Sequence, residues 1–171
     1  MKDGLDMQCV EVAWDNPDAV LLRNAQSADV SSRYGSPINL YEPTPDGLVT
    51  TVVLYENGPA ALPVGCAALV DVTGTEDVFD GRKTVEMRRM FIRPELRGNG
   101  FSRGIIAALH DLARAHGFEQ IVLTSGTKQP EAVGLYKSQG YQDQAPYGIG
   151  KQWDTALFFK HDLSQDAAVS A

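Results

Sequence analysis

Apolar residues follow two periods along the chain, which predict an alternation of strands and helices. Short apolar runs, several of them rich in β-branched residues, are typical of strands. They occupy residues 8–14, 48–55, 64–72, 84–92, 121–124 and 155–160. A further late strand begins at Tyr141, and apolar residues at helical spacing predict helices that start at Pro17, near Ser102 and at Pro130. This order of elements indicates a mixed α/β protein.

Cap and turn residues predict where these elements begin and end. Asn16 before Pro17 predicts an N-capped helix start, and the helical pattern extends, after a break, to Tyr34. Residues 48–92 predict an antiparallel meander of three strands, with a polar hairpin tip at 74–82. The strand that ends this meander leads directly into the most informative stretch of the chain.

Composition limits the class of protein. The chain has 171 residues, 43% of them hydrophobic, which suits a single domain over residues 1–171, with 164–171 expected to be a disordered tail. No apolar run reaches the ~18 residues of a membrane span and no signal peptide is recognised, so we expect a cytoplasmic protein that does not act on a membrane. Cys9 and Cys66 do not indicate a disulfide framework. The net charge of −7 argues against nucleic-acid binding and favours a cationic substrate such as an amine.

A glycine-bearing turn joins the strand end at Met90 to the helix near Ser102. The first N–H groups of a helix have no partner within the helix, and the helix dipole adds partial positive charge, so such a turn is suited to an anion. Gly98 and Gly100 allow a phosphate to approach the backbone. The glycines alone fit an ordinary strand-to-helix turn equally well, and the pattern is neither a dinucleotide fingerprint nor a P-loop.

Two signatures in order resemble the GNAT superfamily of acyl-CoA-dependent N-acetyltransferases. Arg97, Gly100 and Ser102 form R-x-x-G-x-S, which is similar to the family's [Q/R]-x-x-G-x-[G/A]. Ser102 departs from the last position, but serine is small and able to N-cap a helix, so we expect the loop geometry to survive. About 30 residues later, the segment from Gln129 to Tyr136 reads Q-x-x-A-x-x-L-Y and is followed by Q-G-Y, similar to the family's second signature.

The resemblance implies a fold and an activity. It covers residues 84–141 at the level of motifs and the rest of the chain by the order of elements. The implied fold is a mostly antiparallel central sheet of about six or seven strands flanked by about four helices. The implied activity is transfer of an acetyl group from acetyl-CoA, as co-substrate, to an amine by direct attack, without a metal.

Two residues are candidates for the chemistry. In the family, the tyrosine at the place of Tyr136 donates a proton or hydrogen bond to the CoA thiolate that leaves; its other reading is a helix tyrosine packed on the core. An amine needs to lose a proton before it attacks, and Glu86 is the candidate base, since many relatives resemble E-x-x-R-M-x-V at this strand. A bulge would re-aim Glu86. Alternatively, Glu86 is an exposed strand residue paired with Arg88 or Arg89.

The resemblance also implies which residues hold the cofactor. The pantetheine arm of CoA pairs with strand backbone, and the loop holds the pyrophosphate mainly through N–H groups, with charge from Arg97 or Arg103. Gln129 stands where many relatives have an asparagine that contacts the arm. The expected cofactor residues are Met90, Phe91, Ile92, Arg97, Gly98, Asn99, Gly100, Phe101, Ser102, Arg103 and Gln129.

The acceptor is left open by the sequence. The loops at 36–47 and 142–153 are expected to shape its pocket, and the aromatic candidates to line it are Trp14, Tyr34, Tyr41, Tyr147 and Trp153. A small-molecule amine, a peptide N-terminus and a protein lysine all remain, as does assembly into a homodimer. His110, His116 and His161 are expected to be unrelated surface or structural residues. The alternatives are an inactive acyl-CoA-binding sensor of the same fold and a phosphate-ligand protein unrelated to CoA.

Overall fold

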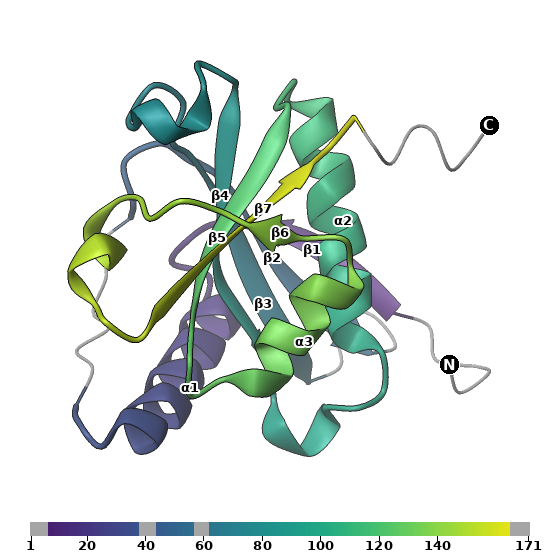
Figure 1. Cartoon of the computed structure of the whole chain (residues 1–171). Helices are drawn as coiled ribbons and strands as arrows, with labels where there is room; N and C mark the ends of the chain where they lie inside the picture. Colours follow the sequence, from purple (N-terminus) through teal and green to yellow (C-terminus); the bar gives the residue numbers. More distant parts are fainter. Residues whose placement is uncertain (1–6, 38–43, 57–61, 165–171) are drawn as a thin grey trace. The chain divides into compact units, whose positions relative to one another are not determined.

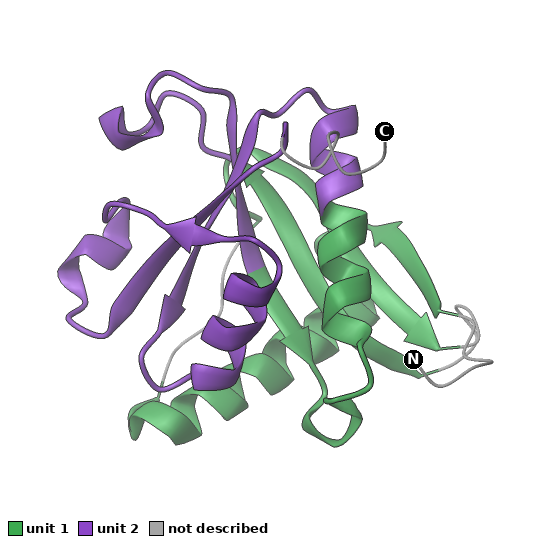
Figure 2. Ribbon diagram, turned by 45° about the vertical axis from the view of Figure 1, so that its right-hand side comes forward, with its two compact units in different colours: residues 1–70, 89–109 green, residues 71–88, 110–171 purple. Residues whose placement is uncertain are grey.

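The computed structural model describes residues 7–37, 44–56 and 62–164 (Figure 1). The chain forms two compact units, coloured separately in Figure 2. Unit 1 contains the described residues of Met1–Val70 and Arg89–Leu109, and unit 2 contains those of Asp71–Arg88 and His110–Ala171. Residues 165–171 of the expected tail lie outside the described residues. A single domain over the whole chain stays a prediction.

Unit 1 is built on antiparallel strands covered by one long helix. Strand β1 (Met7–Val12) pairs with β2 (Leu48–Glu56), which pairs with β3 (Pro63–Asp71). Helix α1 (Pro17–Tyr34) starts as predicted, because the Asn16 side chain accepts hydrogen bonds from the Asp18 and Ala19 N–H groups. It is one continuous helix rather than an interrupted one, and it ends at Gly35 in the left-handed conformation (φ 68°).

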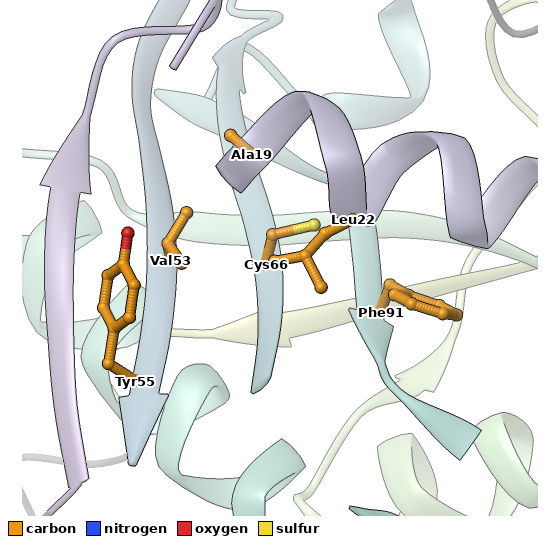
Figure 3. Close-up of a cluster of buried hydrophobic side chains, with 6 residues drawn as sticks. All are labelled: Ala19, Leu22, Val53, Tyr55, Cys66 and Phe91. Carbon is orange, nitrogen blue, oxygen red and sulfur yellow. The ribbon is translucent and has the colours of Figure 1, made fainter. Parts of the chain in front are cut away.

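The core of unit 1 lies between α1 and the strands. Figure 3 shows Ala19 and Leu22 of α1 beside side chains of β2, β3 and β4. The cluster consists of buried residues, at most 5% exposed: Ala19, Leu22, Val53, Tyr55, Cys66 and Phe91. Fully burying one such apolar side chain stabilises the fold by about 1.5–3 kcal/mol, so the cluster anchors α1 to the sheet.

Unit 2 contains a parallel strand pair. Strand β4 (Thr84–Ile92), which runs through both units, pairs in parallel with β5 (Gln120–Gly126) at Thr84–Glu86. Strand β7 (Ala156–Asp162) pairs antiparallel with β5 along seven residues and with the short β6 (Gln142–Asp143). Helix α3 (Pro130–Ser138) lies between β5 and β6 in the sequence.

Three short helical turns complete the description. Segment η1 (Asp77–Phe79) lies where a polar hairpin tip was expected, but its Phe79 is buried, so this segment is packed rather than a simple tip. Segment η2 (Pro94–Leu96) follows β4, and η3 (Ile149–Gln152) lies in the loop before β7. Helix α2 (Phe101–Ala115) passes from unit 1 into unit 2.

The predicted mixed α/β fold is confirmed. The described residues form seven strands in the order β1-β2-β3-β4-β5-β7-β6, three α-helices and three 3-10 turns. Strand β4 has the predicted limits, because its β-branched and apolar residues end at Arg93-Pro94.

Candidate functional site

Strand β4 is irregular just after Glu86. Arg89 has φ of 57°, a left-handed conformation that is uncommon for a residue other than glycine. A residue of this kind within a strand is typical of a β-bulge, which re-aims the neighbouring side chains. This irregularity lies in the strand in which a bulge was considered as a means of re-aiming Glu86.

Glu86 is buried rather than exposed. It is 8% exposed, forms an ion pair with the Arg88 Nε atom, and accepts a hydrogen bond of 3.1 Å from the Tyr147 hydroxyl. The expected pairing with Arg88 is thus present, but not the surface position. Because a buried carboxylate is costly unless it is paired and hydrogen-bonded, these two partners are what hold it in place.

Tyr147 reaches Glu86 from the loop between β6 and β7. Its ring is 4% exposed and packs edge-on against Phe79 and Phe158, with centroid distances of 5.2 Å and 5.4 Å. Burial, and next the negative charge of Glu86, raise the pKa of Tyr147 well above its usual range. The hydroxyl therefore remains a donor toward the carboxylate at every physiological pH.

A second anchor holds the same loop. The Glu76 carboxylate accepts hydrogen bonds from the Gly148 N–H (2.9 Å) and the Lys151 Nζ atom (3.0 Å). Gly148 has φ of 57°, which a glycine adopts without strain. The sequence named Tyr147 only as a lining residue. Its contact with Glu86 joins residues 61 positions apart, and no local pattern signals such a contact.

Tyr136 lies on α3 within an aromatic cluster of unit 2. It is 7% exposed, and its ring lies 5.7 Å from Tyr141 and 6.2 Å from Phe159, centroid to centroid. Burial raises the pKa of Tyr136, so its hydroxyl stays protonated and able to donate. Gln129 occupies the N-cap position of α3, and its half-buried side chain makes no capping hydrogen bond.

The predicted anion loop has the backbone that its glycines permit. Gly98 and Gly100 have φ of 81° and 87°, and a Cβ added at either would meet no atom within 4 Å. The glycines are therefore required by backbone conformation, and the space above them is open. The Gly100 carbonyl accepts from the Arg103 and Gly104 N–H groups, which makes it the first acceptor of α2. Ser102 lies inside the first turn of α2 rather than at its N-cap.

Two residues of the loop stabilise its shape. The Asn99 Nδ2 atom donates to the Leu96 carbonyl at 3.0 Å, and Phe101 is buried at 3% exposed. The hydrogen bond of Asn99 closes the turn after η2, and the burial of Phe101 fixes the start of α2; neither uses the backbone N–H groups of the first turn of α2. Arg103 is exposed on that turn.

Arg97 makes two contacts with distant segments that its motif does not signal. Its Nη2 atom forms an ion pair with Asp29 of α1 at 3.1 Å, and its Nε atom donates to the Ile92 carbonyl at 3.0 Å. Through these two contacts Arg97 ties the loop to α1 and β4, and the same Asp29 carboxylate also pairs with Arg33 of α1 at 3.3 Å. Of the two arginines expected to supply charge to a pyrophosphate, Arg103 is the one on the exposed face of the first turn.

The end of β4 combines buried and accessible positions. Phe91 and Ile92 are each 5% exposed, and Phe91 belongs to the core of unit 1. The Met90 carbonyl accepts a 3.0 Å hydrogen bond from the Gln26 Nε2 atom of α1. The side chains of this segment thus serve packing, and its main-chain groups are what remain for a ligand.

The aromatic residues expected around an acceptor differ in environment. Trp14 is 7% exposed and lies under the Arg23 guanidinium, 3.8 Å from its ring centroid, so it is a core residue of unit 1. Trp153 is 54% exposed on the loop that carries Tyr147. Tyr34 is partly exposed, and Tyr41 lies outside the described residues. Among these candidates, Tyr147 contacts a predicted catalytic residue, Glu86.

Two of the three histidines are related. The rings of His110 and His161 stack at 4.5 Å between centroids, and the His110 Nε2 atom lies 2.9 Å from the Tyr141 hydroxyl. The expectation of three unrelated histidines is therefore wrong for this pair, while His116 is exposed. Among residues 7–37, 44–56 and 62–164, no group of three or more His, Cys, Asp and Glu residues is arranged to hold a metal ion. Over the same ranges, no helix is both long and apolar enough to cross a membrane.

The predicted site residues divide between the units. Unit 2 carries Glu86, Tyr136 and Gln129, and unit 1 carries the end of β4 and the loop at residues 97–103. Strand β4 carries both a predicted catalytic residue and the predicted arm-binding segment.

A family match and similar proteins of known sequence both indicate acetyltransferases. The sequence matches the family described as Acetyltransferase (GNAT) family over residues 17–141. It is 34% identical over 100 residues to an IAA acetyltransferase of Azospirillum brasilense, covering 58% of this chain and 61% of that protein. It is 33% identical over 67 residues to N-acetyltransferase 8 of Rattus norvegicus, covering 39% of this chain and 30% of that protein. The chain thus spans less than two thirds of the length of each.

Solved structures share the fold at low sequence identity. A putative acyl-CoA N-acyltransferase from Klebsiella pneumoniae has a TM-score of 0.71 at 24% identity, covering 92% of this chain and 97% of that one. A putative acetyltransferase from Salmonella typhimurium, solved with its cofactor acetyl-CoA, has a TM-score of 0.59 at 19% identity, covering 92% and 94%.

Proposed function

Because this chain belongs to the acetyltransferase (GNAT) family, we propose that it transfers an acetyl group from acetyl-CoA to the nitrogen of an amine acceptor. One observation carries the proposed mechanism: the buried carboxylate of Glu86, which Arg88 and Tyr147 hold within unit 2. A carboxylate held in one orientation is suited to the role of a general base.

The cofactor is bound by main-chain groups of unit 1. The open space above Gly98 and Gly100 lets a pyrophosphate approach the first N–H groups of α2, and Arg103 adds positive charge on the exposed face of that turn. The main chain of Met90 and Ile92 receives the pantetheine arm. Acetyl-CoA supplies the thioester; the protein supplies position and proton transfer.

Glu86 removes the proton that keeps the amine unreactive. A lysine-like amine has a pKa near ~10.4, so most of it is cationic at neutral pH and lacks a free electron pair. Glu86, directly or through a water molecule, accepts this proton before the nitrogen forms its bond to the acetyl carbon, and the second proton that the nitrogen loses in becoming an amide passes to solvent. The C–S bond of the thioester then breaks and leaves a CoA thiolate.

Tyr136 stabilises the leaving thiolate by donating a hydrogen bond. Burial raises its pKa, so complete transfer of its proton to a sulfur of ordinary pKa about 8.5 is unfavourable. A charge-assisted hydrogen bond from a protonated tyrosine requires no such transfer. The tyrosine thus acts as a donor that remains neutral, and the thiolate takes its proton from solvent after release.

The acceptor belongs to the class of cationic amines, either a small molecule or a peptide N-terminus. The chain's net charge of −7 attracts cations over distances of about a Debye length. An acceptor that carries its positive charge until Glu86 deprotonates it is matched to this field.

The test measures binding and turnover separately. Acetyl-CoA at a hundredfold excess over its dissociation constant is expected to stabilise the fold by about 2.7 kcal/mol in thermal unfolding. Release of free CoA is then followed with a thiol reagent across a panel of amines and peptides. Glu86→Gln is expected to lower the rate most at lower pH, where the amine is charged, while Glu95→Gln, on an exposed side chain of η2, serves as the matched control.

Three outcomes would contradict the proposal or one of its parts. Absence of stabilisation by acetyl-CoA would exclude both an acetyltransferase and an acyl-CoA sensor. Stabilisation without CoA release for any acceptor would favour the sensor over the enzyme. A rate loss in Glu86→Gln that is uniform across pH would remove Glu86 from the role of base.

A further inference from the structure

Gln26 of α1 makes an unusual contact with the end of β4. Its Nε2 atom donates a 3.0 Å hydrogen bond to the Met90 carbonyl, across 64 positions of sequence. Its Oε1 atom is buried and has no hydrogen-bond partner among the described residues. The orientation of the amide is determined by this contact, because turning it over would place two oxygens against each other.

The direction of the Met90 carbonyl follows from the pairing of β4 with β3. The Arg93 N–H donates to the Val64 carbonyl, so the main-chain groups of Arg93 point toward β3. Successive residues of a strand point their main-chain groups to alternate edges, so Phe91 also faces β3, while Met90 and Ile92 face the opposite edge. In agreement, a Cβ added to Gly65 of β3 would lie 2.5 Å from the Phe91 oxygen.

The amide of Gln26 therefore lies at the edge of β4 that faces away from β3. Under the proposed function, on which this inference rests, that edge receives the pantetheine arm. The arm contains two secondary amides, each with one N–H donor and one carbonyl acceptor. A buried acceptor without a donor destabilises the free protein, and an N–H group from a ligand relieves that cost.

We propose that Gln26 is a cofactor-binding residue: its Oε1 atom accepts an N–H of the pantetheine arm while its Nε2 atom remains bonded to the Met90 carbonyl. Gln26 thereby links α1, β4 and the arm in one chain of hydrogen bonds. The carbonyl keeps a second lone pair, so the bond from Gln26 does not prevent the strand backbone from pairing with the arm.

A neighbouring residue of α1 provides a contrast. Asp29, one helical turn beyond Gln26, holds Arg97 at 3.1 Å and with it the loop proposed to bind the pyrophosphate. Helix α1 thus supports both ends of the cofactor site in unit 1, but through different side chains. A change at Gln26 acts on the arm alone, whereas a change at Asp29 acts on the pyrophosphate end.

The experiment uses two ligands that separate these ends. Dissociation constants are measured by calorimetry for acetyl-CoA and for 3′-phosphoadenosine 5′-diphosphate, which lacks the arm. Gln26→Met keeps the length of the side chain and removes both polar atoms. It is expected to weaken acetyl-CoA binding about 2- to 10-fold, the effect of one hydrogen bond, and to leave the fragment unchanged. Asp29→Asn weakens both ligands, and Asn24→Ala, exposed on the same helix, weakens neither.

The results separate this inference from the proposed function. Failure of the unaltered chain to bind acetyl-CoA would defeat the proposed function itself. Binding of acetyl-CoA by the unaltered chain with no weakening in Gln26→Met would defeat the inference alone, as would equal weakening of both ligands, which marks a purely structural contact. If Gln26→Met unfolds, the same two dissociation constants are measured for Gln26→Asn, which keeps the amide on a side chain one methylene shorter. This variant is also expected to bind acetyl-CoA more weakly and the fragment with unchanged affinity.

Discussion

Replacement of Tyr147 by phenylalanine tests whether the Glu86 carboxylate is oriented for catalysis. The change removes one oxygen and with it the 3.1 Å hydrogen bond between two buried groups, while the ring keeps its edge contacts with Phe79 and Phe158. A hydrogen bond to a charged group contributes about 1.5–3 kcal/mol. Arg88 still holds the other carboxylate oxygen, so we expect the lower end of this range.

About 1.5 kcal/mol corresponds to measurable losses in two assays. The melting temperature is expected to fall by roughly 3–6 °C for a domain of this size. If the same bond orients the base, kcat/KM falls about tenfold, since ~1.4 kcal/mol is a factor of ten. The KM for acetyl-CoA is expected to stay unchanged, because Tyr147 contacts Glu86 in unit 2 rather than the cofactor-binding segments of unit 1.

Tyr55→Phe is the matched control. Tyr55 is also buried and donates a hydrogen bond, at 2.7 Å, to a carboxylate, that of Asp18, but it belongs to the core of unit 1. It should lose stability to a similar extent and keep its kcat/KM. Equal kcat/KM in Tyr147→Phe and the unaltered chain, at a temperature where both are folded, would refute the orienting role. An equal rate loss in both variants would show that general destabilisation is the cause.

Three further predictions concern the site and the core of unit 1. Tyr136→Phe should lower kcat roughly 100-fold and leave the dissociation constant of acetyl-CoA unchanged; an unchanged kcat would remove the hydroxyl from the mechanism. Burial, and next the hydrogen bond to Asp18, raise the pKa of Tyr55 from 10.0 to about 12. The stability that the protonated Tyr55 contributes is therefore complete below pH ~10 and is lost as pH rises toward ~12, by about 1.4 kcal/mol per pH unit. Urea titrations at several pH values measure the free energy of unfolding, and Tyr55→Phe should lack this decrease between pH ~10 and ~12. Gly100→Ala places a Cβ at φ of 87°, so it should cost about 1–2 kcal/mol of stability and weaken acetyl-CoA binding. Gly35→Ala, at φ of 68°, is the control and should cost stability alone. Equal acetyl-CoA affinities of the two variants in calorimetry would contradict the role of the loop.

How well a feature was predicted depends on how far apart in the sequence the residues that produce it lie. The limits of β4 and the start of α1 after Asn16 were predicted, because each follows from a few adjacent residues. A strand run, an N-cap and a positive φ are local properties of the chain. The family signatures are local in the same sense, and they led to the correct fold.

The contacts that define the candidate site join distant residues. Tyr147 and Glu86 are 61 positions apart, Gln26 and Met90 are 64, and Arg97 and Asp29 are 68. The motif around Arg97 predicted a charge for a phosphate, and tertiary structure gave that charge a carboxylate partner.

The sequence by itself therefore determined where the elements begin and end and which segments carry a family's signatures. Tertiary structure decided which of those residues are buried, which charges are already paired, and which polar atom still lacks a partner. The physical reason is that burial and pairing depend on the three-dimensional surroundings of a side chain. Residue types restrict those surroundings, but the packing of elements far apart in the chain creates them.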